Sequence, residues 1–280
     1  MRIFLLVAFA AISSLAQAQQ PPAGEVKGTA WQHTPSSLEA ALANAWVALP
    51  PRATGAAAFN GKLSDAPRTL APGAVAVPVL VFAHGSGGIS DAIKQWQKWL
   101  ADEMGVASLT LDSMRLPDRI TYTSPVAKDV YEKVHALRAQ EISAAVAALS
   151  GLAWADTSRL IIAGTSEGAV SVARYQGANG APKEIARIIY SWSCEPNYHV
   201  EAPRTAIPDT MPVLNVMSST DPYFSPANAW LGNSAAKGHC AEALKDNKAA
   251  VIVLIPGAPH TLFNLPAARS VTRAFLQQVL

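Results

Sequence analysis

A five-residue segment near the middle of the chain has the pattern of a nucleophilic serine turn. Residues 164–168 read Gly-Thr-Ser-Glu-Gly, which places a glycine two positions before and two positions after Ser166. The preceding residues 159–163, Arg-Leu-Ile-Ile-Ala, are mostly apolar and predict a strand, and residues 166–175 predict a helix. In a sharp strand–turn–helix connection, small residues let the strand and helix approach each other, and the turn exposes the serine hydroxyl. This context favours Ser166 as a nucleophile over an idle serine in a glycine-rich turn.

A serine hydroxyl needs a base and a third group that orients the base, and both follow later predicted strands. Asp221 comes shortly after a predicted strand at residues 212–217, and His260 comes shortly after one at residues 251–255. Polar groups at the carboxyl ends of parallel strands gather at one edge of a sheet. We therefore expect Ser166, Asp221 and His260 to meet there, in the chain order nucleophile, acid, base.

Other residues could take the roles of base and acid. His199 and His239 are alternative bases, and Glu195 and Asp209 are alternative acids. None of these four follows a predicted strand as directly, so the first assignment is preferred.

A glycine-rich loop at residues 84–88, His-Gly-Ser-Gly-Gly, is of the type that binds an oxyanion. The tetrahedral intermediate of acyl transfer needs N–H donors for its oxygen. We expect one from Glu167, the residue after the serine, and the other from Ser86, with Gly87 as second choice. A phosphate-binding loop is the competing interpretation, but the Lys-Ser/Thr ending of a P-loop and the spacing of a dinucleotide site are missing. His84 is expected to be a structural hydrogen-bonding group.

Apolar strands alternate with helices from residue 75 onward. The predicted strands cover residues 75–83, 106–111, 159–163, 186–192, 212–217 and 251–255. The predicted helices cover residues 91–104, 126–152, 166–175 and 267–280, and residues 227–245 are expected to be partly helical. Strands without polar alternation are buried on both faces, as in a parallel sheet. The pattern predicts an α/β fold with a mostly parallel central sheet and helices on both faces.

The segment before residue 75 gives weaker signals. Residues 19–35 look irregular, and residues 36–49 predict a helix that Ser36 or Ser37 caps and Pro50 ends.

The domain organisation is expected to be simple. No repeat or linker separates residues 19–74 from the core at residues 75–280, so we expect both to form one domain. Residues 194–211 and 220–238 contain prolines and are expected to leave the sheet as a lid or pocket wall.

The first residues have the three parts of a secretory signal peptide. Met1-Arg2 is positively charged, residues 3–12 are apolar, and Ala16-Gln17-Ala18 is a small-residue cleavage site. The apolar run is shorter than the about 20 residues that a bilayer span needs, which makes an uncleaved anchor the weaker alternative. We therefore expect residues 1–18 to be removed and residues 19–280 to reach the periplasm or the extracellular medium.

Composition excludes several classes of protein. With 50% hydrophobic residues the chain is not intrinsically disordered, and two cysteines cannot build a disulfide-dense scaffold or a four-cysteine zinc module. A formal charge of +2, which falls by one when Arg2 is removed, and the lack of a basic run argue against nucleic acid as a partner. No metal-ligand cluster of suitable spacing is visible, and no metal or organic cofactor is expected.

Taken together, the chain resembles the α/β-hydrolase superfamily and, more narrowly, the dienelactone hydrolase family. The segments that follow that family's order are 84–88, Asp112-Ser113, 164–168, Tyr190 to Cys194, Thr220-Asp221-Pro222 and Pro259-His260. The resemblance covers residues 75–280 and implies an α/β-hydrolase fold. The namesake enzymes have a cysteine nucleophile where this chain has Ser166, so an esterase or related acyl hydrolase is expected rather than an enzyme for dienelactone itself.

The two cysteines, Cys194 and Cys240, could form a bridge. Two thiols in an exported protein are usually paired, and members of the family that the chain resembles have cysteines near both positions. A bridge would close a loop of about 46 residues and stabilise the fold by about 4 kcal/mol in the chain-entropy picture. Two buried free thiols are the alternative, because a bridge needs Cα atoms within about 7 Å.

We therefore expect an exported serine hydrolase that cleaves a small-molecule ester or lactone through an acyl-enzyme, without stable membrane insertion after signal cleavage. A peptidase, amidase or acyltransferase with the same residues is the alternative among enzymes, and a binding protein is the alternative outside them. Arg115 and Arg119 could meet a substrate carboxylate, although a solvated loop is preferred for both. Aromatic residues that could line the pocket are Tyr122, Trp192, Tyr198, Tyr223, Phe224 and Phe263.

Overall fold

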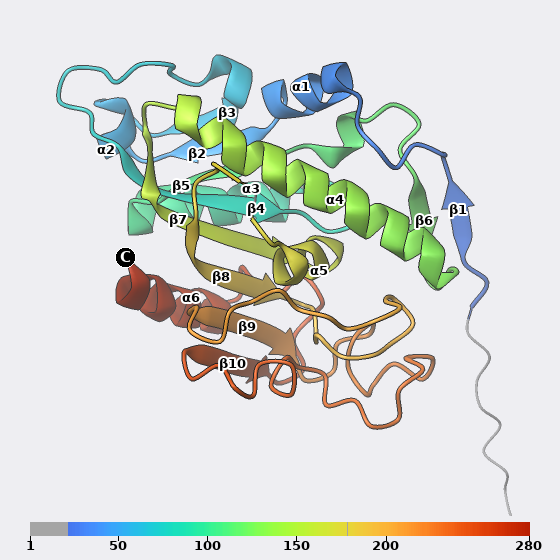
Figure 1. Ribbon diagram of the computed structural model, residues 1–280. Helices are drawn as coiled ribbons and strands as arrows, with labels where there is room; N and C mark the ends of the chain where they lie inside the picture. Colours follow the sequence, from blue (N-terminus) through green and yellow to red (C-terminus); the bar gives the residue numbers. More distant parts are fainter. Residues whose placement is uncertain (1–21, 178) are drawn as a thin grey trace, which may run out of the picture.

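An eight-stranded sheet lies at the centre of the protein, in a computed structural model that describes residues 22–177 and 179–280 (Figure 1). Its strands are β2 (Trp46–Leu49), β3 (Phe59–Lys62), β4 (Val77–Ala83), β5 (Ala107–Thr110), β7 (Ala155–Thr165), β8 (Glu184–Tyr190), β9 (Val213–Ser218) and β10 (Ala250–Ile255). They lie in the order β10-β9-β8-β7-β4-β5-β2-β3. Neighbouring strands from β10 to β5 are parallel, and β2 is antiparallel to both β5 and β3. The predicted signal peptide, residues 1–18, lies outside the described residues.

The register of the parallel strands brings their carboxyl ends together at one edge of the sheet. Ala83 at the end of β4 lies opposite Gly164 near the end of β7, and Thr165 lies opposite Tyr190 of β8. On the other side of β9, Ser218 lies opposite Ile255 of β10. The segments that follow these strands therefore emerge side by side.

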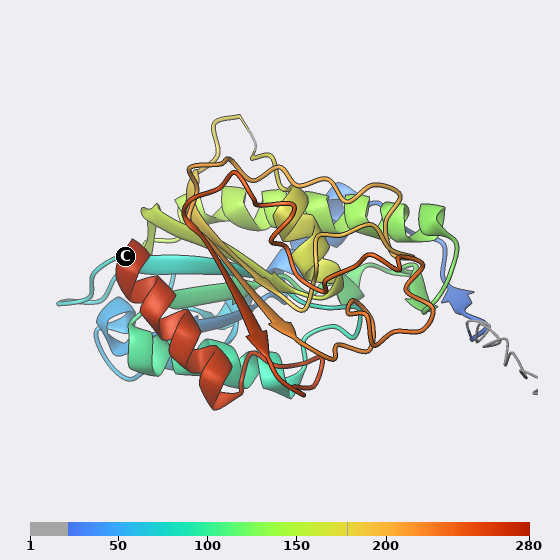
Figure 2. The ribbon, with the colours of Figure 1, turned by 90° about the horizontal axis from the view of Figure 1, so that it is seen from below.

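Helices cover both faces of the sheet and complete two apolar layers. The main helices are α3 (Asp91–Trp99), α4 (Lys128–Ala148), α5 (Glu167–Arg174) and α6 (Pro266–Val279). Figure 2 shows α4 and α5 on one face and α3 and α6 on the other. Ile142 and Ala169 belong to the core layer under α4 and α5, whereas Trp96 and Leu276 belong to the opposite layer. The predicted α/β architecture with a mostly parallel sheet is confirmed.

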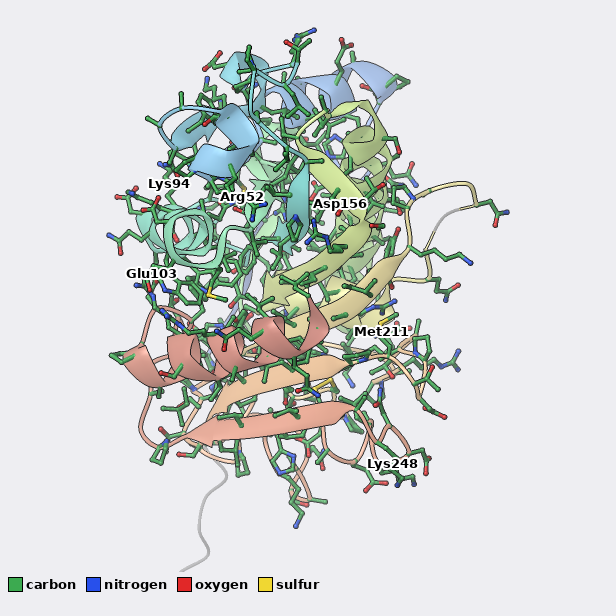
Figure 3. The ribbon with its side chains drawn as sticks, turned by 90° about the vertical axis from the view of Figure 1, so that its left-hand side faces the viewer. Arg52, Lys94, Glu103, Asp156, Met211 and Lys248 are labelled. Atoms are coloured by element: carbon green, nitrogen blue, oxygen red, sulfur yellow. A yellow bond between two sulfur atoms is a disulfide. The ribbon has the colours of Figure 1, made fainter. Side chains whose placement is uncertain are left out.

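Smaller elements surround this core. They are β1 (Glu25–Lys27), α1 (Pro35–Ala43), α2 (Pro51–Thr54), η1 (Leu63–Asp65), η2 (Leu100–Met104), η3 (Ser113–Arg115), β6 (Thr121–Thr123) and η4 (Leu149–Gly151). β1 and β6 pair antiparallel to each other, outside the main sheet. Charged residues such as Glu103 and Lys248 lie at the outside of the molecule (Figure 3). Within the described ranges, no helix has the length and apolar character that crossing a bilayer requires.

The N-terminal segment differs from its prediction. The helix expected over residues 36–49 ends at Ala43, and Trp46–Leu49 forms β2. These four residues are aromatic, β-branched or aliphatic and pair on both sides with other strands, so pairing outweighs the helical pattern. The helix cap is Thr34, which accepts a hydrogen bond from the Ser37 N–H in a capping box, rather than Ser36 or Ser37.

The prediction of partial helix over residues 227–245 is wrong. This segment consists of turns and bends. Short polar side chains here accept hydrogen bonds from the backbone two residues ahead. The side-chain oxygen of Asn228 accepts from the Trp230 N–H, and the side-chain oxygen of Asn233 accepts from the Ala235 N–H. Such Asx turns compete with helix formation.

A disulfide joins this loop segment to the residues after β8. Cys194 and Cys240 are both buried, and their Cα atoms lie 4.8 Å apart. The bridge spans 46 residues of sequence, which include β9 and Asp221. It therefore restricts the unfolded chain over the part of the sequence that carries the predicted acid.

We expect the double variant Cys194→Ser/Cys240→Ser to lose about 4 kcal/mol of unfolding free energy, because the unfolded chain regains the freedom of this loop. Urea unfolding of the variant and the wild type would measure the loss. Adding reductant to the wild type should lower its stability toward that of the variant, and adding it to the variant should change nothing. A loss below about 1 kcal/mol would show that the bridge does not restrict the unfolded chain in this way.

Candidate active site

Ser166 lies in a sharp turn between β7 and α5, as the sequence predicts. Its backbone has φ 54° and ψ −123°, a conformation that residues other than glycine rarely adopt. A Cβ atom at Gly168 would lie 2.2 Å from the Ala83 carbonyl oxygen, and one at Gly164 would lie 2.9 Å from the Gly168 backbone. Both positions therefore require glycine, because α5 packs directly against the ends of β4 and β7.

His260 and Asp221 form a hydrogen-bonded pair. His260 Nδ1 lies 2.7 Å from Asp221 Oδ2, and the Asp221 side chain is fully buried. The other carboxyl oxygen, Oδ1, accepts hydrogen bonds of 2.9 Å from the N–H groups of Tyr223 and Phe224. These bonds fix the carboxylate, so that Oδ2 is directed to the imidazole and can only accept its Nδ1 proton. The remaining ring nitrogen, Nε2, is thereby left as a proton acceptor.

Ser166 and His260 line one cavity of about 380 Å³. Gly85 and Ser86 of the glycine-rich loop line it too, and a Cβ at Gly85 would lie 3.3 Å from the Ser166 Cβ. Among the described residues, the Ser166 hydroxyl has no hydrogen-bond partner, His260 included. The structure thus brings the three residues to one site and joins two of them directly.

Two buried serine hydroxyls hold the backbone of the loop that carries His260. Ser191 Oγ donates to the His260 carbonyl oxygen at 2.5 Å, and Ser218 Oγ donates to the Ala258 carbonyl oxygen at 2.6 Å. Ser191 directly follows β8, has φ 53° and is held by its N–H bond to the Val216 carbonyl. Serine hydroxyls at the ends of β8 and β9 therefore hold the loop of His260 by hydrogen bonds to its backbone.

The glycine-rich loop forms a tight turn beside Ser166. The Gly88 N–H bonds to the Gly85 carbonyl at 3.2 Å, which places Ser86 and Gly87 at the tip of the turn. In the described part of the chain, neither of these two N–H groups has a hydrogen-bond partner. Both are therefore free to bind an oxygen in the cavity.

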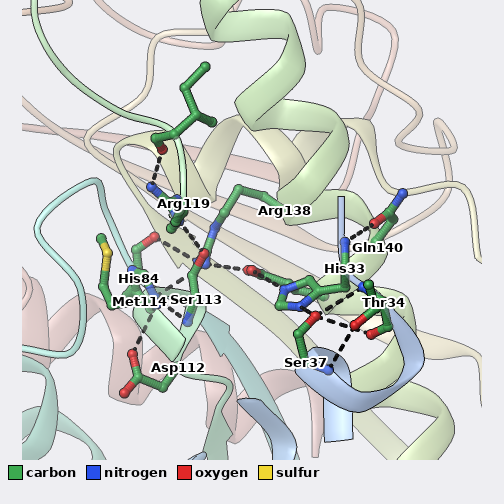
Figure 4. A network of polar contacts seen from close by, with 12 residues as sticks. His33, Thr34, Ser37, His84, Asp112, Ser113, Met114, Arg119, Arg138 and Gln140 are labelled. Atoms are coloured by element: carbon green, nitrogen blue, oxygen red, sulfur yellow. Dashed lines mark hydrogen bonds and ion pairs between the residues drawn. The ribbon is translucent and has the colours of Figure 1, made fainter. Parts of the chain in front are cut away.

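A buried polar network holds the start of this loop (Figure 4). The Ser113 N–H donates to His84 Nε2, so the ring proton lies on Nδ1, which bonds to the Gly85 carbonyl at 2.6 Å. Burial, and next the Arg138 guanidinium, hold the pKa of His84 well below its usual value. Arg138 also donates to the His84 carbonyl at 3.0 Å. His84 is therefore a neutral structural group, and it does not line the cavity.

The side chain of Glu167 is anchored by arginine. Its carboxylate accepts from Arg119 at 2.8 Å, and Arg138 lies 3.6 Å from the same oxygen. Arg119 also donates to Ser113 Oγ at 2.7 Å and to the Ile120 carbonyl at 2.9 Å. The preference for a solvated loop at Arg119 is therefore wrong, because this side chain is buried against Glu167. Arg115, by contrast, is exposed and paired with Asp112.

The alternative bases and acids, and the aromatic residues expected in the pocket, lie partly in the cavity and partly outside it. His199 lines the cavity, whereas Glu195 binds the N–H groups of Lys237 and Gly238. Asp209 and His239 do not line the cavity. Of the six aromatic residues, Trp192 lies in the core beside Phe224, and the other five line the cavity.

Sequence reasoning missed the supporting residues. Arg138 and Ser191 carry no local motif, because each acts through a partner that is distant in the sequence. The one signal for Ser191 was its place near the end of the predicted strand at residues 186–192, close to Cys194.

Comparison with known proteins identifies the fold. No protein-family model matches the chain, and no curated protein matches it. A putative dienelactone hydrolase from Klebsiella pneumoniae subsp. pneumoniae superposes with a TM-score of 0.51 at 16% identity, over 84% of this chain and 98% of that chain. Est1E from Butyrivibrio proteoclasticus gives 0.47 at 20% identity, over 84% of this chain and 91% of that chain. Porphyromonas gingivalis dipeptidyl peptidase 4 gives 0.49 at 16% identity, over 84% of this chain and 35% of that chain. The first of these likenesses shows that the chain has the α/β-hydrolase fold.

Ser191→Ala is expected to lower kcat on a hydrolysed ester about fivefold with little change in KM, because the loop of His260 loses a hydrogen bond worth about 1 kcal/mol. Ser193→Ala is the matched control, since the buried Ser193 hydroxyl has no hydrogen-bond partner in the described structure. Steady-state kinetics of the two variants would make the comparison. Equal kcat values for both would refute the role assigned to Ser191.

Glu141→Gln is expected to destabilise the protein at pH 7 by about 3 kcal/mol, because buried Arg138 loses the nearer of its two carboxylate partners and keeps only Glu167, 3.6 Å away. Although burial raises the pKa of Glu141, Arg138 and hydrogen bonds from His33 and Ser113 lower it more, to about 2. A lowered carboxyl pKa stabilises the fold above the unfolded value near 4.5, and this contribution is lost as the pH falls toward 2.

The gap between wild type and Glu141→Gln should therefore narrow from pH 4.5 downward in urea unfolding experiments. Glu242→Gln, which removes an exposed partner of Lys245, serves as the control and should stay near wild type. A gap that stays constant down to pH 2 would contradict the assignment.

Proposed function

We propose that the protein is a serine hydrolase that cleaves a carboxylic ester or lactone through an acyl-enzyme. The observation that carries the proposal is the strained turn that presents Ser166 to the same cavity as the His260–Asp221 pair. Strain of this kind persists where the surrounding structure enforces it, and such sites are commonly catalytic. Here the close packing of α5 against the ends of β4 and β7, which the two glycines of the turn allow, enforces it.

In the proposed reaction, His260 Nε2 takes the proton of the Ser166 hydroxyl as the serine oxygen attacks the substrate carbonyl. Asp221 holds Nδ1–H and stabilises the imidazolium that forms. The N–H groups of Ser86 and Glu167 bind the oxygen of the tetrahedral intermediate. The imidazolium then gives its proton to the leaving alcohol oxygen. Water, activated by the same histidine, attacks the acyl-enzyme and releases the acid.

The size of the cavity supports a small substrate. About 380 Å³ lies at the lower end of the volumes that hold small molecules, roughly 300–1,000 Å³. A small ester or lactone fits this space. Such a substrate also agrees with the resemblance to the dienelactone hydrolase family. The structural neighbour with the TM-score of 0.51 bears that family's name.

The location proposed for the protein is the periplasm or the extracellular medium. The pattern of residues 1–18 supports export, and the Cys194–Cys240 disulfide fits an oxidising compartment.

Labelling with a fluorophosphonate probe would test the nucleophile. Wild type and Ser193→Ala should both be labelled, and Ser166→Ala should not, because the probe reacts with an activated serine. Circular dichroism of each variant would verify that it is folded. Absence of labelling in folded wild type would remove the hydrolase proposal.

A paired substrate assay would test the kind of bond that is cleaved. The wild type should hydrolyse p-nitrophenyl butyrate, and Ser166→Ala should lose at least a thousandfold in kcat. An aminoacyl p-nitroanilide should be cleaved much more slowly than the ester. The reverse preference would replace the esterase by a peptidase or amidase.

A further inference from the structure

The cavity that holds Ser166 has an uncharged wall. Among the residues that line it there is no lysine, arginine, aspartate or glutamate. Burial lowers the pKa of His199 well below its usual value, and burial raises the pKa of both Tyr122 and Tyr198. The imidazole and the two phenols therefore stay neutral near pH 7. Polar contacts to a bound molecule would come from neutral groups such as the Ser124 hydroxyl.

Two arginines lie behind this wall, and a glutamate balances each of them. Arg119 donates to the Glu167 carboxylate at 2.8 Å, and its side chain is only 3% exposed. The same carboxylate shares a side-chain hydrogen bond with Tyr122, which lines the cavity. The second arginine, Arg138, is paired with Glu141. The two guanidinium charges are therefore balanced within the network, and neither is available to an anion in the cavity.

The Asp221 carboxylate adds a negative charge beside the cavity. It is fully buried and bonds to His260, which lines the cavity. Within residues 22–177 and 179–280, no lysine or arginine forms an ion pair with it. A carboxylate that moves from water into such a site loses its hydration and gains no compensating cation. An acidic group on a substrate would therefore be unfavourable here.

We infer that the substrate is an ester or lactone without an acidic group, and that the Arg119–Glu167 pair sets this selectivity. This inference rests on the proposed function. Arg119 carries a positive charge behind the wall, and Glu167 cancels it, so a substrate carboxylate meets no attractive field. The selectivity thus depends on the balance of one buried ion pair, whose side chains take no part in the proposed reaction.

Two pairs of esters that differ in charge but hardly in shape test the inference. In the acyl part, monomethyl glutarate carries a carboxylate where methyl glutaramate carries an amide. In the alcohol part, 4-acetoxybutanoate differs from 4-acetoxybutanamide in the same way. At about pH 8, where both acids are ionised, kcat/KM of the amide is divided by kcat/KM of the acid. Dividing this ratio by the ratio of the alkaline hydrolysis rates removes the difference in intrinsic reactivity.

We expect the wild type to favour the amide by about tenfold or more in at least one pair, because the amide enters the cavity without the loss of charge hydration. Glu167→Gln should narrow this preference about fivefold, because Arg119 keeps its charge and loses the carboxylate that balances it. Arg119→Gln should widen the preference, because the Glu167 carboxylate then faces only Arg138, 3.6 Å away. A merely structural disturbance would not move the ratio in opposite directions in the two variants.

The buried Arg187–Glu184 pair provides matched controls. Its side chains are 2% and 8% exposed, and neither residue lines the cavity. Glu184→Gln and Arg187→Gln each remove one member of a buried ion pair, as the test variants do. Both ratios should nevertheless stay at wild-type values in these controls.

Equal efficiency on amide and acid in both pairs, or a preference for the acid, would overturn the inference and leave the proposed function standing. The wild type alone decides this point, even where a variant does not fold. Ratios that do not move in opposite directions in Glu167→Gln and Arg119→Gln would overturn the role of the ion pair. Failure of the wild type to hydrolyse any of the four esters would count against the proposed function itself.

Discussion

The close contact between α5 and the end of β4 is the constraint on which the site depends. Gly168 lies so near the Ala83 and His84 carbonyls that no side chain fits between them. This contact leaves Ser166 no room for a relaxed turn and also sets the glycine-rich loop against it. In the proposed reaction the nucleophile and the oxyanion donors must lie within about 3 Å of one reacting group, and this backbone contact sets Ser166 beside the glycine-rich loop.

A second constraint joins the histidine to the serine through residues 190–194. The Tyr190 carbonyl accepts from the Ser166 N–H, and the hydroxyl of the next residue, Ser191, supports the loop of His260. At the end of the segment, Cys194 is bridged to Cys240, whose N–H binds the Asn215 side chain of β9. The strand ends and the disulfide thus act on one short segment. This arrangement explains how long, turn-rich loops can carry an acid and a base without losing their mutual geometry.

The sequence predicts most of the sheet and its helices, because apolar runs and helical periodicity are local properties. It also indicates Ser166, Asp221 and His260, since each follows a strand and the carboxyl ends of parallel strands meet. The sequence-based prediction is wrong where strand pairing determines the secondary structure. Trp46–Leu49 continues a helical pattern but joins the sheet as β2. The prediction is wrong again at residues 227–245, where Asx turns use the backbone groups that a helix would need.

The buried charges show why the polar part of the site escapes sequence analysis. Arg119 follows a strand by several residues and looks like any loop arginine, yet it is buried against Glu167, which lies far away in the sequence. A buried ion pair is poor evidence for stability, because desolvation opposes the attraction between the charges. The Arg119–Glu167 pair has a different role, because Glu167 is the residue that directly follows Ser166. The arginines fix the Glu167 side chain and thereby support the residue whose backbone N–H we propose as an oxyanion donor.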